Sequence, residues 1–240
     1  MKIQSGCNKN RRTKTKFQHL IITRVNIYLY EESLSEEWNV KRMKMLNENL
    51  RASLALQTCQ NFKLISLWGN SYSGGELENE HKEFIDISPL KNDRTEKEKQ
   101  RWRQEFYPQI KKIAQKHSGE KFTLITRTDS DDKFEPDFVA KLQNAVKFDI
   151  VPYYYDVDKI FILNRGKLAG EKTEHKEPKN TSAFVSVLEK DVQCYSYQAG
   201  GHPAVGKKMR GKIVPSLTAW SCLHESNVSR RHSKRKKPIR

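Results

Sequence analysis

The sequence has little cysteine, no long apolar run and no P-loop motif. Its 240 residues include four cysteines, which are widely scattered and form no C-x-x-C pair. A structural zinc cage or a disulfide framework is therefore not indicated, and we expect reduced, mostly buried thiols. No run of about 18 apolar residues exists, which excludes a transmembrane span. Because the spacing G-x-x-x-x-G-K-[ST] is absent, a P-loop NTPase is disfavoured.

Positive charge is concentrated at the two ends of the chain. Residues 1–16 carry six Lys or Arg and no acid, and residues 207–240 carry eleven Lys or Arg and one Glu. Removing these from the totals of 45 basic and 29 acidic residues leaves 28 of each, so the body of the chain is neutral. Basic ends can bind nucleic acid, bind anionic lipid head groups or only aid solubility. Their charge therefore does not decide the function.

We interpret residues 17–228 as one domain between a basic, flexible segment at 1–16 and a basic, disordered tail at 229–240. The short apolar stretch near the N-terminus has no small-residue cleavage site, so no signal peptide is expected. The expected location is the cytoplasm, where the tail could make peripheral contact with the anionic inner face of the membrane.

Apolar patterning predicts strands that alternate with helices. The predicted strands are at residues 17–24, 62–68, 84–87, 121–126, 150–155 and 159–163, with a strand or short helix at 183–188. The predicted helices are at residues 36–57, at 92–117 and from about 136 onward. This order is typical of a three-layer α/β/α sandwich with a mostly parallel (mixed) central sheet. In such sheets ligands bind beyond the carboxyl ends of the strands.

An acidic cluster, Asp129, Asp131 and Asp132, directly follows the strand predicted at residues 121–126. Three carboxylates within four residues repel one another unless a cation or a set of hydrogen-bond donors satisfies them. Asp129 and Asp131 project to one side of an extended segment and could share a hard divalent ion and the hydroxyls of a bound sugar. The same pattern also fits a solvated turn in which Asp132 favours the dipole of the following helix.

Several segments stand in a characteristic order: HLIITRVNI (19–27), LRASLALQTCQNFKLISLW (50–68), LITRTDSDDKFEPDFVAKLQ (124–143), SAFVSVLE (182–189) and SCLHESNVSRR (221–231). In order and spacing they resemble the "putative rhamnosyltransferase" family of bacterial glycosyltransferase-like proteins. That family has an Arg-x-Asp-Ser-Asp-Asp signature and a closing motif with His, Asn and Ser. The basic ends and the polar insert around residues 166–180 depart from its pattern, so acceptor recognition does not follow from the resemblance.

The resemblance implies a GT-A-like, metal-dependent glycosyltransferase. Such an enzyme would move a sugar from a nucleoside-diphosphate donor to a glycan or lipid-linked acceptor in polysaccharide biosynthesis. A divalent cation, Mn²⁺ or Mg²⁺, would neutralise the charge that develops on the departing diphosphate. The implied metal ligands are Asp131 and His224, although His224 could equally be a surface histidine. Asp129 would hold the ribose or the sugar, and Asp132 would make a supporting or substrate contact.

Further donor-binding candidates lie at predicted strand ends and in a turn. Arg24 and Arg127 could bind the diphosphate through forked hydrogen bonds, or could be surface ion-pair partners. Thr23 closes the first strand, where the nucleotide base lies in this fold, and His202 in a Gly-Gly-His-Pro turn could contact phosphate or have no chemical task. Glu189 is the expected general base of an inverting transfer, or else a salt-bridge partner behind a core strand.

Two other functions fit the same residues. A metal-dependent nuclease or phosphoryl-transfer enzyme would bind two Mg²⁺ at the acidic cluster and hold nucleic acid with the basic ends. It would need further carboxylates on other strands, for which Asp156, Asp158 and Glu189 are the candidates. A non-catalytic protein that binds through its basic tail is the third possibility.

Overall fold

The computed structural model describes residues 17–27, 35–69, 77–88, 95–164, 167–172, 181–198 and 204–223. The basic segments 1–16 and 229–240 lie outside these ranges. The strands are β1 (Gln18–Arg24), β2 (Lys63–Trp68), β3 (Glu80–Phe84), β4 (Thr123–Asp129), β5 (Lys133–Phe134), β6 (Tyr153–Asn164), β7 (Lys167–Lys172), β8 (Ser186–Glu189) and β9 (Gly211–Leu223). The helices are α1 (Glu36–Met45), the π-helical stretch η2 (Leu46–Arg51), α2 (Ala52–Ala55), α3 (Glu96–His117), α4 (Phe138–Ala145), α5 (Tyr195–Gln198) and α6 (Val205–Lys208).

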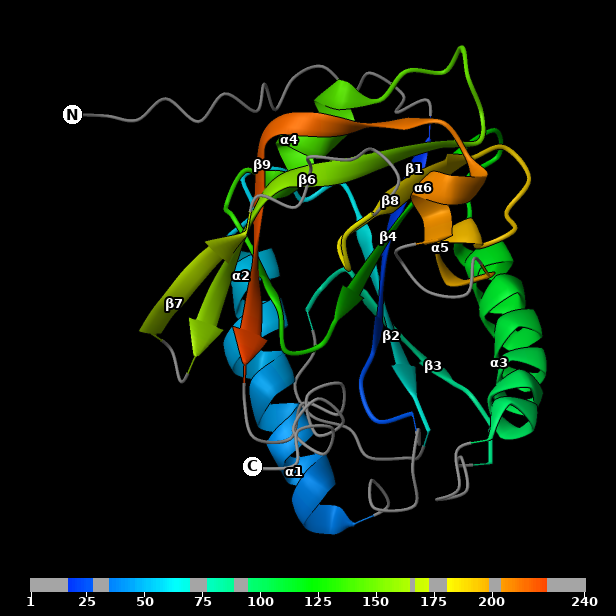
Figure 1. The fold of residues 1–240 in the computed structure, drawn as a ribbon, viewed down its shortest axis with the longest axis vertical. Coiled ribbons are helices and arrows are strands. Elements are labelled where there is room, and N and C mark those ends of the chain that lie inside the picture. The colour runs from blue at the N-terminus through cyan, green and yellow to red at the C-terminus, as the bar shows by residue number, and fades with distance from the viewer. Residues whose placement is uncertain are drawn as a thin grey trace, which may run out of the picture.

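The described strands form one mixed sheet in the order β3-β2-β1-β4-β8-β6-β9-β5, with β7 paired to β6 (Figure 1). The neighbours β3, β2, β1 and β4 run parallel to one another, whereas β8 runs antiparallel to both β4 and β6. Beyond them β9 runs parallel to β6. The expected mixed, mostly parallel sheet is thus confirmed.

Helices cover both faces of the sheet, with α1 and α2 on one side and α3 on the other (Figure 1). One core cluster joins Leu46, Leu50 and Leu54 to Phe138 and to the sheet. The second joins Ile22 and Ile125 to the apolar side of α3, with Trp102, Phe106, Ile110 and Ile113. Alternating strand residues supply the two clusters, because successive side chains of a strand point to opposite faces. The three-layer architecture follows from these two cores.

The helical periodicity located α1 to α2 and α3 closely, and side-chain caps explain where they begin. Ser35 accepts a hydrogen bond from the backbone of Trp38 at 3.2 Å, and Thr95 accepts one from that of Glu98 at 3.2 Å. Such caps satisfy N–H groups that have no partner inside the helix. Of the helices that the structure describes, none combines the length and the apolar character needed to cross a bilayer.

Two strand predictions were wrong. The third strand occupies Glu80–Phe84 rather than residues 84–87, because it pairs with β2 in the register Leu64↔Glu80. The strand pair predicted around Asp156–Asp158 is a single strand, β6, which continues through both aspartates. Asp156 does not break the strand, because its carboxylate accepts hydrogen bonds from the backbone and hydroxyl of Ser182 and from the backbone of Val157.

A buried polar network ties the π-helical stretch to the sheet. The guanidinium of Arg51 donates two hydrogen bonds of 2.8 Å to the carboxylate of Glu80, whose side chain is fully buried. The hydroxyl of Ser66 donates to the same carboxylate, and the indole of Trp68 donates to Ser66. Trp68 is fully buried, so it belongs to the core and its ring is not exposed for stacking against a ligand.

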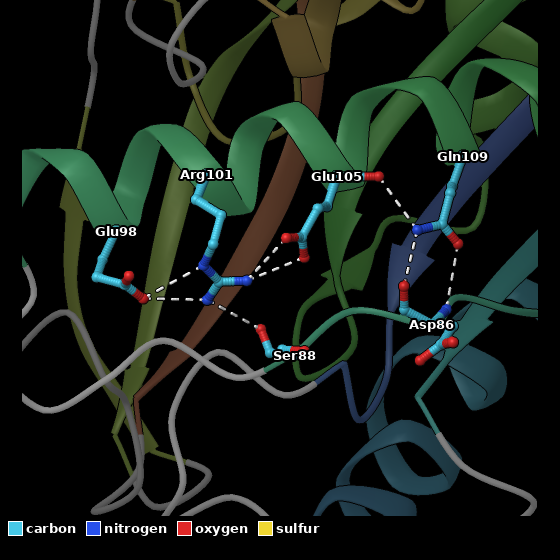
Figure 2. A network of polar contacts seen from close by, with 6 residues as sticks. All are labelled: Asp86, Ser88, Glu98, Arg101, Glu105 and Gln109. Atoms are coloured by element: carbon cyan, nitrogen blue, oxygen red, sulfur yellow. Dashed lines mark hydrogen bonds and ion pairs between the residues drawn. The ribbon is translucent and has the colours of Figure 1, made fainter.

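A second network, on α3, fastens the segment that follows β3 (Figure 2). Arg101 bridges Glu98 and Glu105 and donates to the backbone carbonyl of Ser88. The amide of Gln109 bonds both the carbonyl and the N–H of Asp86, at 2.8 and 3.1 Å. These hydrogen bonds satisfy backbone groups of the segment that continues beyond the end of β3, so residues 85–88 are held against α3.

Candidate functional site

The acidic cluster lies at the carboxyl edge of the parallel strands, as the sequence predicted. β4 extends to Asp129, three residues further than predicted, and residues 130–132 then turn the chain into the short strand β5. The backbone N–H of Asp132 closes this turn on the carbonyl of Asp129 at 3.2 Å. Because β5 pairs with β9 through Lys133↔Trp220 and Phe134↔Ala219, the turn lies next to the end of β9, the last strand that the structure describes.

Arg24, Arg127 and Asp129 come together at this edge. Arg24 and Asp129 are register partners on β1 and β4, and the guanidinium donates to the carboxylate at 3.1 Å. Both side chains remain partly exposed, at 22% and 41%. Burial raises the pKa of Asp129, but the charges of Arg24 and Arg127 outweigh it and bring the pKa to about 2. The positive charges of two guanidinium groups therefore act on this one carboxylate, and Arg24 bonds it directly.

Arg127 faces an aromatic ring rather than an acid. Its guanidinium carbon lies 5.2 Å from the centre of the ring of Tyr197, on α5. Within the described part of the chain, its side chain makes no hydrogen bond or ion pair. Burial and the neighbouring charge of Arg24 lower the pKa of Arg127. Among the described residues, the N–H donors of this guanidinium thus have no acceptor.

The other side of the acidic turn is held by Arg42, from α1. Its guanidinium donates to the hydroxyl of Ser130 at 2.5 Å, to the carboxylate of Asp131 at 3.4 Å and to the carbonyl of Val25 at 3.4 Å. The side chains of Arg42 and Asp131 are 14% and 9% exposed. Arg42 therefore joins α1, the end of β1 and the acidic turn in one set of contacts.

Asp132 is tied to the end of β9. Its carboxylate accepts the backbone N–H of Cys222 at 3.2 Å and a hydrogen bond from the side chain of Ser221. Asp132 is almost fully buried, and this burial, together with the charges of Asp131 and Asp129, raises its pKa well above the usual value. The negative charges of Asp131 and Asp129 therefore disfavour the charged form of Asp132.

The chemistry of these carboxylates fits a hard divalent cation. Mg²⁺ and Mn²⁺ prefer oxygen ligands and often take one or two carboxylates together with phosphate oxygens. A cation beside Asp131 would also relieve the repulsion that raises the pKa of Asp132. Among the described residues, however, no three His, Cys, Asp or Glu side chains lie close enough to hold a metal by themselves. Additional ligands would have to come from a bound diphosphate or from other parts of the chain.

Two predicted residues, His202 and His224, lie outside the described residues. The metal-binding role of His224 and the donor-binding role of His202 therefore stay predictions.

Thr23 does not face the same space as Arg24. The side chain of Thr23 is fully buried, and its hydroxyl has no hydrogen-bond partner among the described residues. Adjacent residues of a strand point to opposite faces, so Thr23 lies on the α1 side of the sheet and Arg24 on the α3 side. The structure therefore does not bring the Thr23 side chain to Arg24 and Arg127.

The prediction that Glu189 is the general base needs correction. β8 runs antiparallel to β4 and pairs Glu189 with Thr123, at the opposite end of β4 from Asp129. Thr123 lies six residues before Asp129 on β4, which corresponds to about 20 Å along the strand. The carboxylate is buried and accepts backbone N–H bonds from Gln193, Cys194 and Tyr195 at 2.6 to 2.9 Å. Glu189 is thus far from the acidic turn and already satisfied.

Sequence reasoning missed Arg42 and Tyr197. Arg42 stands in an ordinary polar position of a helix, and Tyr197 lies in a segment where no helix was predicted. Neither residue belongs to a motif, so only the packing of α1 and α5 against the sheet brings them to the site.

Comparisons with known proteins agree with the resemblance seen in the sequence. No curated protein sequence matches the chain. Solved structures that resemble it include two described as "Crystal structure of S. aureus TarS" and "Crystal structure of S. aureus TarS 1-349". They are 12% and 14% identical, cover 86% and 85% of this chain, and have TM-scores of 0.42 and 0.41. The chain spans only 37% and 60% of those two proteins.

A third structure is described as "Structure of the inositol-1-phosphate CTP transferase from T. maritima". It is 11% identical, covers 93% of this chain and 98% of its own, and has a TM-score of 0.39. The sequence model of the family described as "Putative rhamnosyl transferase" matches residues 12–236. Because this match spans nearly the whole chain, the protein belongs to this family.

Proposed function

We propose that the protein transfers a sugar from a nucleoside-diphosphate donor to a glycan or lipid-linked acceptor in polysaccharide biosynthesis, with a GT-A-like site. Membership of the family supports a sugar transfer. The position of the acidic turn and the arginines at the carboxyl edge of β1 and β4 supports the place of the donor, because ligands of open α/β sheets bind at this edge.

The observation that carries the proposal is the unbalanced charge of Arg24, Arg127 and Asp129. Two guanidinium groups beside one carboxylate attract an anion. The donors of Arg127, which have no acceptor in the part of the chain that the structure describes, suit the oxygens of a diphosphate. Binding the diphosphate there would also stabilise the negative charge that develops on it as the sugar departs.

Asp129, Asp131 and Asp132 have different tasks in this proposal. Asp129 orients Arg24 and contacts the ribose or the sugar, whereas the buried Asp132 fixes the turn to β9. Asp131, with His224, would hold Mn²⁺ or Mg²⁺. That ion, when bound, would supply charge neutralisation for the leaving diphosphate.

The nuclease alternative has less support. It needs further carboxylates that bridge two metal ions, yet each candidate is occupied by protein donors. Asp156 is bonded to Ser182, Asp158 accepts the backbone N–H of Ser216 at 3.2 Å, and Glu189 lies at the opposite edge of the sheet.

The proposal is tested by thermal stabilisation with UDP, GDP, dTDP and CDP, with and without Mn²⁺. A ligand that binds only the folded protein raises its melting temperature. We expect one nucleotide to stabilise the wild type in the presence of Mn²⁺, and Asp131→Asn to lose the Mn²⁺-dependent part. Glu120→Gln, an exposed carboxylate that precedes β4, is the matched control and should behave like the wild type. Stabilisation by DNA or RNA but by no nucleotide would contradict the proposal.

A further inference from the structure

Glu189 organises a turn instead of acting as a base. Its two carboxylate oxygens accept the backbone N–H groups of three successive residues, Gln193, Cys194 and Tyr195. One of these, Cys194, has a backbone φ of 55°, in the left-handed region that non-glycine residues rarely adopt. Hydrogen bonds to a carboxylate are stronger than those between neutral groups, so Glu189 can hold this unfavourable conformation in place.

The turn fixes the start of α5, which carries Tyr197. The backbone N–H of Tyr197 bonds the carbonyl of Cys194 at 2.9 Å, directly after the turn. Helix α3 supports the same segment, because Lys111 donates to the side chain of Gln193 at 2.7 Å. A short helix of four residues has little stability of its own, so these contacts decide where it lies.

Tyr197 contacts both strands that carry the arginines. Its hydroxyl donates to the carbonyl of Ile22 at 2.8 Å, and its ring faces the guanidinium of Arg127. Ile22 is the register partner of Arg127 across β1 and β4. The ring is buried against Phe106, with the two ring centres 6.1 Å apart. Tyr197 is therefore fixed at its hydroxyl and its ring, directly beside Arg127.

We propose that Tyr197 and Glu189 are positioning residues for Arg127. Glu189 holds the left-handed turn, the turn places α5, and the ring of Tyr197 directs the guanidinium of Arg127 toward the donor diphosphate. This inference rests on the proposed function, because it takes Arg127 as a diphosphate-binding residue.

The aromatic contact suits this task better than an acidic partner would. An aromatic face attracts the guanidinium without occupying the N–H donors at its edge. A carboxylate in the same place would take two of these donors and cancel the charge that attracts phosphate. The ring thus restricts the movement of Arg127 and leaves its charge and its donors to the ligand.

The test is a double-mutant cycle between Tyr197 and Arg127, read by calorimetric titration with UDP, GDP, dTDP, CDP and inorganic pyrophosphate. Tyr197→Leu should weaken binding of the preferred nucleotide roughly fivefold to thirtyfold. Tyr197→Phe, which keeps the ring, should stay within about threefold of the wild type. In an Arg127→Gln background, Tyr197→Leu should have no further effect, because the group that it positions is gone.

Tyr155→Leu is the matched packing control. Tyr155 is also fully buried, its hydroxyl bonds the backbone of Lys147, and Lys212 lies 5.6 Å from its ring centre, yet it belongs to the other core cluster. The variant should lower the melting temperature to an extent comparable with Tyr197→Leu and leave nucleotide affinity unchanged. If Tyr155→Leu weakens binding equally, the effect at position 197 is general destabilisation and the inference is overturned.

Glu189→Gln provides a milder variant that keeps the side-chain shape. We expect a severalfold loss of nucleotide affinity that also disappears in the Arg127→Gln background. Equal effects of Tyr197→Leu or Glu189→Gln in both backgrounds would refute positioning, even if Arg127 binds the diphosphate. If Arg127→Gln alone leaves every affinity unchanged, then the proposed role of Arg127, and this inference with it, fails.

Discussion

Arg24 and Asp129 are neighbours in two senses: they are register partners on β1 and β4, and their side chains form an ion pair of 3.1 Å. The parallel pairing of two strands thus brings together residues 105 positions apart in the sequence. The pair lies next to Arg127, so the charges of the three groups act together.

Replacing Arg24 should weaken donor binding. We expect Arg24→Gln to lower nucleotide affinity by about 10- to 100-fold, because a charge-assisted hydrogen bond contributes about 1.5–3 kcal/mol. The nucleotide affinity of Arg24→Lys should lie between those of the wild type and Arg24→Gln, since a lysine keeps the charge but lacks the forked donors. Calorimetric titration measures the effect, and Arg210→Gln, an exposed arginine just before β9, is the control. Unchanged affinity in Arg24→Gln would place the diphosphate elsewhere.

Position 132 should tolerate replacement of the carboxylate by an amide, but not removal of the side-chain oxygen atoms. Asp132→Asn keeps an oxygen that can accept the N–H of Cys222, and it removes a charge that Asp131 and Asp129 disfavour. We expect its free energy of unfolding to stay within about 1 kcal/mol of the wild type, and Asp132→Ala to lose about 1–3 kcal/mol because the part-buried hydrogen bond from Cys222 is lost. Urea unfolding distinguishes the two, and an equal loss in both variants would argue for an essential charge.

His19 should make the fold sensitive to acid. Its ring is buried between Thr126 and Gln143, and burial lowers its pKa from 6.5 to about 3. The unfolded chain takes up a proton at this residue below about pH 6.5, whereas the folded protein does not until about pH 3. Stability from the neutral ring is therefore complete above pH 6.5 and falls by up to ~1.4 kcal/mol for each pH unit below it.

His19→Gln removes this titration. Its free energy of unfolding should be lower than that of the wild type at pH 7.5, and the gap should narrow between pH 6.5 and pH 4. Urea unfolding at several pH values measures the gap. A gap that is constant with pH would show that His19 titrates alike in both states.

Gly211 should not accept a side chain. A Cβ atom there would lie 2.1 Å from the ring of Tyr154, which is buried. We expect Gly211→Ala to cost about 1–3 kcal/mol, since the ring must move in a packed cluster. Gly170→Ala on β7, where an added Cβ meets nothing within 4 Å, is the matched control and should change stability by at most about 0.5 kcal/mol. Denaturant unfolding of both variants checks this difference.

Local patterns in the sequence located most of the elements. The apolar runs of β1, β2 and β4 and the helical spacing of Trp102, Phe106, Ile110 and Ile113 predicted their positions closely. The acidic cluster was correctly placed at a strand end. These predictions held because strand and helix periodicities depend on neighbours within a few residues.

The predictions that failed depended on distant pairing. β6 runs through Asp156 because Ser182 satisfies the carboxylate, and no local pattern reveals this contact. Glu189 matched a motif, yet the direction of β8 places it beside Thr123, where its carboxylate bonds the turn before α5.

The sequence by itself determined the alternation of strands and helices, the family and the acidic turn after a buried strand. Only the tertiary structure decided which charged groups surround that turn: Arg24 through the pairing of β1 with β4, Arg42 through the packing of α1, and Tyr197 beside Arg127 through the placement of α5. The reason is physical. Backbone periodicity is local, whereas the direction of a strand and the position of a short helix are set by contacts between segments far apart in the chain.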